Sequence, residues 1–300
     1  MIARALLGRG VRAALDAAAR VAAFLVSTTP ALESPFVRTG RILAGTRAGN
    51  SYYRRARNYL AQRLRRGGRS FRRIEICGET LELDVADLTG HAPFFLGIPY
   101  EKSLTILVSG LQPGATFVDI GANIGYFTVL AARRVGNTGR VYAFEPHPDA
   151  RAQLAASLAR NGVAHRVEIC GDALSDVDDR AVELFVTAHG SSYSTLRPTT
   201  AAVPANTFTR SIPVRTTTFD TWLRAHPCDP ALIKLDVEGA EDLVFRGMSS
   251  TLRSHPPRRI VCETTRGGAA DAMLRGYGYR VQSIEGSAAT VYGNFLYERD

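Results

Sequence analysis

Two glycines enclose a short turn that follows an apolar run near the middle of the chain. The run is TFVDI at residues 116–120, and Gly121 and Gly125 bracket the next three residues. Glycine permits a tight turn and lets the backbone approach a ligand closely. Asp119 can hold this loop through backbone amides or reach the ammonium group of a ligand through water, and Asn123 can cap the helix that follows. The segment therefore predicts a loop that cradles a ligand.

Carboxylates follow the next two apolar runs. Glu145 comes directly after the run at 140–144, and a carboxylate at the tip of a strand can accept hydrogen bonds from both hydroxyls of a ribose. The alternative for Glu145 is an acid favoured by the dipole of a helix expected at 148–161. Asp172 and Ala173 follow the third run, and Asp172 is placed to accept a hydrogen bond from an adenine amino group. Together these residues predict a nucleoside cofactor.

The spacing of the glycines bears on which nucleoside cofactor is bound. A dinucleotide fingerprint reads Gly-x-Gly-x-x-Gly, whereas this chain has Gly-x-x-x-Gly, with Asn123 where a pyrophosphate requires glycine. S-adenosylmethionine carries no phosphate, so an asparagine is acceptable there. Residues 116–145 alone leave NAD and S-adenosylmethionine both open, and the spacing favours S-adenosylmethionine.

Three charged residues recur with period two at the end of a later apolar run. Lys234, Asp236 and Glu238 lie in the stretch IKLDVEGAE, and alternate residues of a strand face the same way. Charged groups at an apolar strand end are costly unless they are used. We predict that Asp236 contacts the cofactor and is the general base or orients the acceptor, with Lys234 paired to Asp236 or Glu263. Glu238 is alternatively the N-terminal acid of a helix at 238–247.

Glu263 and His189 complete the candidate catalytic residues, with Lys234 and Asp236. Glu263 ends the run IVCE and is expected near the same edge as Asp236. Asp236, Glu238 and Glu263 together can bind a divalent ion, although no histidine spacing supports a metal site. His189, in the segment AHGSSYS, can contact the acceptor or act as the base. The alternative for His189 is a solvated loop histidine.

Strands and helices must alternate to position these residues. From Thr116 onward, short apolar runs and longer stretches of helical period follow one another, which predicts an α/β fold with a mostly parallel sheet and helices on both faces. The last two runs lie close together around Gly286-Ser287, so the final strand is expected to be antiparallel. The strand candidates are 116–120, 140–145, 166–170, 182–186, 231–237, 258–263, 279–284 and 290–297. The helix candidates are 124–135, 148–161, 217–225, 238–247 and 267–277.

Three segments are expected along the chain. Residues 1–73 form a basic, Arg-rich helical N-terminal extension, and residues 74–115 contain a hairpin around Gly78-Glu79 and a lead-in segment. Residues 116–300 form the cofactor-binding domain. Within it, residues 187–215 are rich in Thr, Ser and Pro without clear periodicity, which predicts a lid or insertion.

Six motifs resemble the FkbM family of S-adenosylmethionine-dependent methyltransferases, over roughly residues 100–285. They are VDIGANIGYFT (118–128), GRVYAFEPHP (139–148), DALSD (172–176), GSS (190–192), VRTTTFDTWL (214–223) and IKLDVEGAE (233–241). The resemblance implies a Rossmann-like class I methyltransferase fold with seven strands and S-adenosylmethionine as the cofactor. It also implies O-methylation of a hydroxyl on a sugar, glycolipid or other natural product. The N-terminal extension falls outside it.

The net charge of +9 belongs to the first third of the chain. Residues 1–100 contain 16 Arg and 7 acidic residues, and the remaining residues are neutral in sum. Met1–Val26 is apolar but interrupted by charges, so none of its uninterrupted apolar runs approaches the roughly 20 residues of a membrane span. An amphipathic helix is expected at 1–26, which packs on the domain or lies as a basic helix on an anionic membrane surface. Four scattered cysteines without a Cys-x-x-Cys pair fit a reducing cytoplasm.

Three other functions are compatible with parts of the sequence. The stretch at 50–73 interleaves Tyr52, Tyr53 and Tyr59 with arginines, which is compatible with an RNA methyltransferase that has a basic arm. A second is a non-catalytic adenosine-ligand-binding module, against which the intact acidic residues count. A third is a dinucleotide oxidoreductase, which the glycine spacing disfavours. Because the cofactor-binding region is neutral, a small-molecule or glycan acceptor is favoured over nucleic acid.

Overall fold

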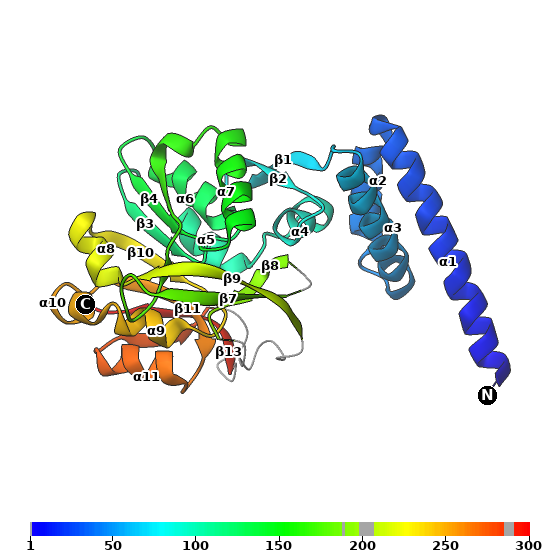
Figure 1. Ribbon diagram of the computed structural model, residues 1–300. Coiled ribbons are helices and arrows are strands. Elements are labelled where there is room, and N and C mark those ends of the chain that lie inside the picture. The colour runs from blue at the N-terminus through cyan, green and yellow to red at the C-terminus, as the bar shows by residue number, and fades with distance from the viewer. Residues whose placement is uncertain (1, 188–189, 198–206, 285–290) are drawn as a thin grey trace. The chain divides into compact units, whose positions relative to one another are not determined.

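The chain divides into two compact units. A computed structural model describes residues 2–187, 190–197, 207–284 and 291–300, drawn as a ribbon in Figure 1. The units are Met1–Lys102 and Ser103–Asp300. His189 and the Gly286-Ser287 connection lie outside the described residues.

A seven-stranded sheet forms the centre of the second unit (Figure 1). Its strand order is β12-β13-β11-β10-β3-β4-β5. The pairs from β11 through β10, β3 and β4 to β5 are parallel, and β13 is antiparallel to both β11 and β12. The predicted Rossmann-like fold with an antiparallel last strand is thereby confirmed. The strands are β3 (Thr116–Ile120), β4 (Arg140–Phe144), β5 (Val167–Cys170), β10 (Pro230–Leu235), β11 (Arg259–Thr265), β12 (Arg280–Ser283) and β13 (Tyr292–Glu298).

Helices cover both faces of this sheet. Val118 and Ile120 of β3 pack in one apolar cluster with residues of α8, α9, α10 and α11. Because side chains alternate along a strand, Asp119 points to the opposite face, where it contacts Thr128 of α6. Thr105 of α5 meets Tyr126 of α6 on that second side. The helices are α5 (Lys102–Ser109), α6 (Tyr126–Val135), α7 (Pro148–Arg160), α8 (Phe219–Ala225), α9 (Glu241–Arg246), α10 (Ser249–Ser254) and α11 (Ala269–Gly276).

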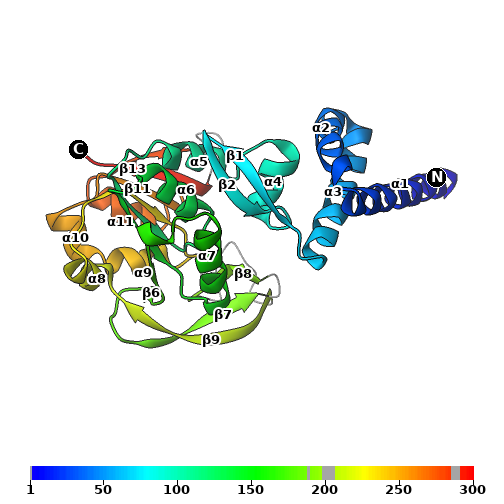
Figure 2. The ribbon, with the colours of Figure 1, turned by 90° about the horizontal axis from the view of Figure 1, so that it is seen from above.

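A second, four-stranded sheet is inserted between β5 and α8. Its order is β6-β9-β7-β8, and β7 and β9 form the long antiparallel pair that is clear in Figure 2. The strand expected at 182–186 belongs to this sheet and not to the central one. The described part of 187–215 is also not irregular, because β8 and most of β9 lie in it. The strands are β6 (Ala173–Leu174), β7 (Ala181–Thr187), β8 (Gly190–Thr195) and β9 (Phe208–Thr217).

The first unit contains a helical part, followed by a hairpin and a short helix. α1 (Ile2–Thr28) and α3 (Arg47–Arg66) pack along one another, with α2 (Glu33–Leu43) beside α3. Gly40 of α2 lies against Tyr53 of α3, and a Cβ atom at Gly40 would lie 1.9 Å from the tyrosine ring. This helix pair therefore requires glycine at that position. Among the described residues, no helix combines the length and the apolar character that crossing a membrane demands.

The expected hairpin follows these helices. β1 (Phe71–Ile76) pairs in antiparallel fashion with β2 (Glu79–Asp84), and α4 (Leu88–Leu96) completes the unit. Cys77 and Gly78 form the turn with φ values of 50° and 83°, as the two-residue turns that join twisted strands require. A pocket of about 610 Å³ in this unit is lined in part by Arg38, Arg41 and Arg73, and none of the candidate site residues lines it.

Candidate functional site

Three neighbouring strands bring the candidate site residues to one edge of the central sheet. β10, β3 and β4 are adjacent and parallel, so their carboxyl ends meet at the same edge. Gly121, Glu145 and Asp236 are the residues that directly follow these three strands. In open α/β sheets, ligands bind beyond the carboxyl ends of the strands. The topology therefore places the predicted cofactor and catalytic residues where such a fold binds its ligand.

The glycine loop is shaped by close contacts with its neighbours. Gly121 has a φ of 79°, and a Cβ atom there would lie 1.8 Å from the Asp236 carbonyl oxygen. Gly125 has a φ of 91°, and a Cβ atom there would lie 2.4 Å from a methyl carbon of Leu154. Gly125, and not Asn123, is the N-cap of α6. The predicted cap at Asn123 is wrong, because Asn123 itself has a positive φ of 48° and the turn continues to Gly125 before the helix begins.

Glu145 is buried and oriented by the backbone. Its side chain is 7% exposed, and its two oxygens accept hydrogen bonds from the amides of Asn123 and His147, each at 2.8 Å. Burial raises the pKa of Glu145 to about 7, while the two amides and the Lys234 ammonium act in the opposite direction. Each carboxylate oxygen can accept more than one hydrogen bond. Glu145 is thus held in a fixed position with acceptor capacity to spare.

Lys234 is the buried cation at the centre of the site. Its Nζ donates to the Gly121 carbonyl at 2.9 Å, and it lies 3.4 Å from Asp119 Oδ1 and 3.5 Å from Asp236 Oδ2. The predicted pairing with Asp236 is therefore present. A buried ammonium is tolerated because opposite charges and a carbonyl oxygen compensate its loss of hydration. Through these contacts Lys234 joins the end of β10 to the glycine loop.

Asp119 acts on the glycine loop indirectly. Its side chain is fully buried, and its Oδ2 accepts a hydrogen bond from the Thr128 hydroxyl at 2.6 Å. Among the described residues no backbone amide donates to Asp119, so the expectation that it holds the loop in this way is wrong. The alternative, a water-mediated contact with the ammonium group of a ligand, stays a prediction. The partners of Asp119 are the Thr128 hydroxyl and the Lys234 ammonium, and Lys234 in turn holds the Gly121 carbonyl.

Asp236, Glu238 and Glu263 lie together at the edge of the sheet. One carboxylate oxygen of each lies within 4.8 Å of the corresponding oxygens of the other two. The Asp236 side chain is 25% exposed, and among the described residues its Oδ1 has no hydrogen-bond partner although the atom is buried. Oxygen ligands of this kind suit a hard divalent cation, but Lys234 already balances part of the charge of Asp236. The three carboxylates together therefore form a negatively charged surface that can accept hydrogen bonds or protons from a ligand.

The local path of the chain at Glu238 differs from the predicted one. β10 ends at Leu235, and Glu238 and Gly239 have φ values of 56° and 96°. Period two is therefore lost after Leu235, and a left-handed turn brings Glu238 to the acidic cluster. The helix expected at 238–247 begins only at Glu241, so Glu238 is not its N-terminal acid.

Glu241 is a site residue that sequence reasoning did not single out. It is buried, its Oε1 accepts a hydrogen bond from the Gly239 amide at 2.8 Å, and burial raises its pKa. This bond closes the turn that presents Glu238. The signal in the sequence was an acidic pair directly after Val-Glu-Gly-Ala, which is typical of a helix start with acids in its first turn.

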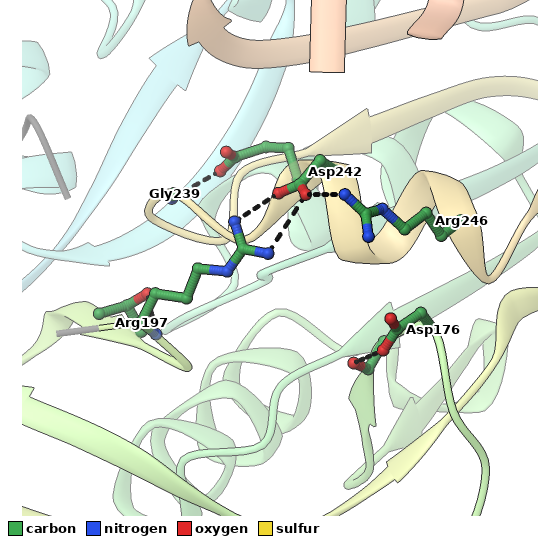
Figure 3. Close-up of polar contacts among 8 residues, drawn as sticks. Asp176, Arg197, Gly239, Asp242 and Arg246 are labelled. Carbon is green, nitrogen blue, oxygen red and sulfur yellow. Dashed lines mark hydrogen bonds and ion pairs between the residues drawn. The ribbon is translucent and has the colours of Figure 1, made fainter. Parts of the chain in front are cut away.

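Asp242 joins the inserted sheet to α9. It is almost fully buried and accepts hydrogen bonds at 2.8 and 3.2 Å from the two terminal nitrogens of Arg197, which follows β8. Figure 3 shows this paired arrangement, with Arg246 contacting the same carboxylate at 3.2 Å from the next turn of the helix. The figure also shows the bond between Gly239 and Glu241 beside it. Sequence reasoning missed Arg197, because its partner is 45 residues away.

The remaining candidate residues flank Glu145 or fall outside the description. Asp172 is exposed just beyond β5, the strand that pairs with β4, and Ala173 is buried beside it. His147, whose amide orients Glu145, also caps α7 through its ring Nδ1, which accepts from the Asp149 amide at 3.2 Å. His189 lies outside the described residues, so its predicted contact with the acceptor stays a prediction.

Comparison with known proteins identifies relatives of the region that carries this site. The model of the methyltransferase FkbM domain matches residues 119–281, which is more than half of the chain. The match begins at Asp119 and contains Glu145, Asp172, Asp236 and Glu263.

Curated relatives align over short segments. The 31-O-demethyl-FK506 methyltransferase FkbM of Streptomyces tacrolimicus is 46% identical over 67 residues, which are 22% of this chain and 24% of that protein. The AMB antimetabolite synthetase AmbE of Pseudomonas aeruginosa is 44% identical over 68 residues, 23% of this chain and 3% of that protein. The aligned part therefore spans a quarter or less of the length of each relative.

Solved structures are similar at low sequence identity. A putative rRNA-methylase from Clostridium thermocellum is 13% identical, with a TM-score of 0.42, over 66% of this chain and 93% of that chain.

Proposed function

The chain belongs to the FkbM methyltransferase family, and from this premise we propose that it O-methylates a hydroxyl of a sugar, glycolipid or other natural product. Membership of this family makes the chain an S-adenosylmethionine-dependent methyltransferase, and the acceptor is the part that we propose. The observation that carries the proposal is the acidic cluster of Asp236, Glu238 and Glu263 beside the cofactor loop. Carboxylates accept hydrogen bonds and protons from hydroxyl groups.

The residues around the glycine loop fit the nucleoside part of S-adenosylmethionine. Glu145 would hold the ribose hydroxyls, because its oxygens are fixed by two amides and retain acceptor capacity. Asp172 would accept from the adenine amino group next to it. Gly121 lets the chain after β3 approach the end of β10, because a Cβ atom there would lie 1.8 Å from the Asp236 carbonyl oxygen. When bound, S-adenosylmethionine supplies an electrophilic methyl group, so the protein's task is mainly to position the acceptor.

Asp236 is the residue we assign to the acceptor hydroxyl. Its buried Oδ1 has no hydrogen-bond partner among the described residues, and a buried polar atom without a partner is costly. The side chain as a whole is 25% exposed, so an acceptor hydroxyl can approach this carboxylate and donate a hydrogen bond to it. Asp236 then orients the hydroxyl and takes its proton as general base. Lys234 Nζ lies 3.5 Å from the other oxygen, Oδ2, and holds the carboxylate in place.

The charge of the cluster also bears on the acceptor class. Three carboxylates within 4.8 Å of one another repel the phosphates of a nucleic acid, which counts against the RNA alternative. Polyhydroxylated neutral acceptors donate hydrogen bonds to carboxylates and meet no such repulsion. The relative from Streptomyces tacrolimicus is named as a methyltransferase of 31-O-demethyl-FK506, and this supports transfer to an oxygen.

A transfer assay with methyl-labelled S-adenosylmethionine tests the proposal. The panel contains neutral glycosides, glycolipids, polyketides and total RNA, with and without EDTA. We expect label in a neutral hydroxylated acceptor, as an ether that resists mild alkali, and full activity in EDTA because Asp236 acts without a metal. Label that appears only in RNA, or as an alkali-labile ester, would overturn the proposal. Activity that EDTA abolishes and Mg²⁺ restores would overturn the metal-free role of Asp236.

A further inference from the structure

The outer face of α1 is apolar although it lies at the surface. Val11, Val21, Phe24 and Leu25 are 56%, 58%, 49% and 48% exposed. The residues between them on the same side are the exposed alanines 13, 14, 17 and 18. A helix on the surface of a soluble domain ordinarily has its polar residues on the outside. These eight residues define the outer face of α1. Because this face is apolar and exposed, we expect another molecule to cover it.

The opposite face of α1 is already used. Ala19, Ala23 and Val26 are buried. They lie on the side where α1 packs along α3, and Figure 1 shows the two helices beside one another. The helix is consequently apolar on both sides, one covered by α3 and one exposed. Packing within its own unit explains the covered side and leaves the outer face unexplained.

Arginines border the outer face along its edge with α3. The Arg63 guanidinium stands over the Phe24 ring at 4.8 Å and donates to the Ser27 hydroxyl, and Arg69 donates to the Ser27 carbonyl. Arg20 stands over Tyr59 one turn earlier. Residues 1–73 contain 16 Arg and only 2 acidic residues. An apolar stripe with a cationic border matches a surface that is apolar inside and anionic outside.

We propose that α1 lies flat on an anionic lipid membrane, with the outer face at the boundary between headgroups and acyl chains. A second copy of the chain is the less suitable occupant, because it would bring the same excess of arginines against this one. Nucleic acid is also less suitable, because its charged phosphate backbone would not cover the apolar side chains of the outer face. Tyr53 is 1% exposed and the Tyr59 hydroxyl bonds Asp16 at 2.7 Å, so these aromatic side chains face the protein and not a base.

Vesicle sedimentation of the full chain tests this proposal. We expect binding to phosphatidylcholine vesicles that contain phosphatidylglycerol, little binding to pure phosphatidylcholine, and weakening of the binding in high salt. Replacing Phe24→Ser and Leu25→Ser together should lower the partition coefficient at least about tenfold, since two large apolar side chains no longer enter the lipid. Val177→Ser is the matched control, a similarly exposed residue of the second unit, and should bind as the wild type does.

A second measurement reports where Phe24 lies. The Phe24→Trp variant should show a blue shift of its emission when anionic vesicles are added, beyond any change that the buried Trp222 shows in the wild type. Equal binding to both kinds of vesicle, unchanged binding by the Ser variant, or no blue shift would overturn the proposal. Concentration-dependent dimerisation that the Ser substitutions abolish would assign the face to a second copy. Salt-sensitive RNA binding that the same substitutions abolish would assign it to nucleic acid.

Discussion

At the scale of single residues, Glu145 is the side chain on which cofactor affinity depends most. Two backbone amides hold the two carboxylate oxygens of Glu145 in place. We expect each of these oxygens to accept a further hydrogen bond from a ribose hydroxyl. Glu145→Ala removes two charge-assisted hydrogen bonds, each contributing about 1.5–3 kcal/mol. The dissociation constant for S-adenosylmethionine in calorimetry should rise at least about 100-fold. Glu168→Ala, an exposed glutamate on the adjacent strand β5, is the control and should bind normally.

The pH dependence of binding should follow the same carboxyl group. The pKa of Glu145 is raised to about 7 by burial, and the ionised form is the one that accepts from two hydroxyls. Affinity should therefore fall as the pH drops below about 7, by about tenfold at pH 6. The stability of the unliganded protein should change with pH in the opposite direction. Because the pKa of Glu145 is raised from 4.5 to about 7 on folding, this group stabilises the fold fully below pH 4.5, and its contribution is lost as the pH rises through about 7.

Glu145→Gln separates this titration from that of the ligand. The titrating groups of S-adenosylmethionine are the same for both proteins, so they cancel when the two affinity profiles are divided. The ratio of wild-type to variant affinity should increase from pH 5.5 to 7.5. A flat ratio across this range would show that Glu145 does not control the binding.

Asp236 should affect turnover more than binding. Asp236→Asn keeps the shape of the side chain but removes its capacity as a base, and general base catalysis contributes typically 10²- to 10⁴-fold. We expect kcat to fall at least about 100-fold while the affinity for S-adenosylmethionine changes only a few-fold. Asp229→Asn makes the same substitution beside the other end of β10, at an exposed position, and should leave kcat unchanged. Wild-type turnover in Asp236→Asn would exclude it as the base.

At the scale of elements, the Arg197–Asp242 pair should determine how firmly the inserted sheet is held to α9. Asp242 is almost fully buried, and Arg197→Ala removes two of its hydrogen bonds. Arg246 keeps part of the charge compensated, so we expect a loss of about 1–3 kcal/mol in the free energy of unfolding. Arg210→Ala breaks an exposed ion pair of the same sheet with Asp149, and should cost less than about 1 kcal/mol.

Hydrogen exchange locates the effect of Arg197→Ala. We expect faster exchange of the β7 and β8 amides in the variant, with the amides of β3 and β10 unchanged. Loss of protection throughout the central sheet, or no loss anywhere, would show that the pair does not connect these two elements.

The elements of the central sheet were predictable because each buried strand is a short apolar run. β3 and β4 match their expected bounds to within one residue. β9 was not predicted, because Phe208–Thr217 has no continuous apolar run and contains Arg, Ser and Thr, and most of its residues are exposed or half-buried. Strands that pair far from the main core carry a weak apolar signal, and hydrogen bonding with β7 decides their structure.

For the candidate site, the sequence was sufficient to predict which residue types lie at the ends of which strands. Glu145, Lys234 and Asp236 were expected at one edge, because parallel strands bring their carboxyl ends together. The route by which Glu238 reaches Asp236 was not predictable, because it depends on two consecutive residues at positive φ. The pairing of Arg197 with Asp242 was also inaccessible, since sequence spacing carries no information about contacts between distant elements.

At the scale of the whole molecule, the net positive charge and the candidate active site belong to different units. The excess of arginines lies in the first 100 residues, and residues 101–300 have as many basic as acidic side chains. All the candidate cofactor and catalytic residues belong to the second unit, which has its own buried core. This separation implies that membrane contact and methyl transfer can be measured independently.

A fragment of residues 101–300 tests that separation. It retains α5, whose Leu104 and Val108 are fully buried, and it lacks α1 with its outer face. We expect the fragment to fold cooperatively and to bind S-adenosylmethionine within about threefold of the full chain, because Glu145, Asp172 and the glycine loop are all present. It should not bind anionic vesicles, since it carries neither the apolar face nor the net positive charge. A fragment that folds but binds vesicles as strongly as the full chain would place the membrane contact in the second unit instead.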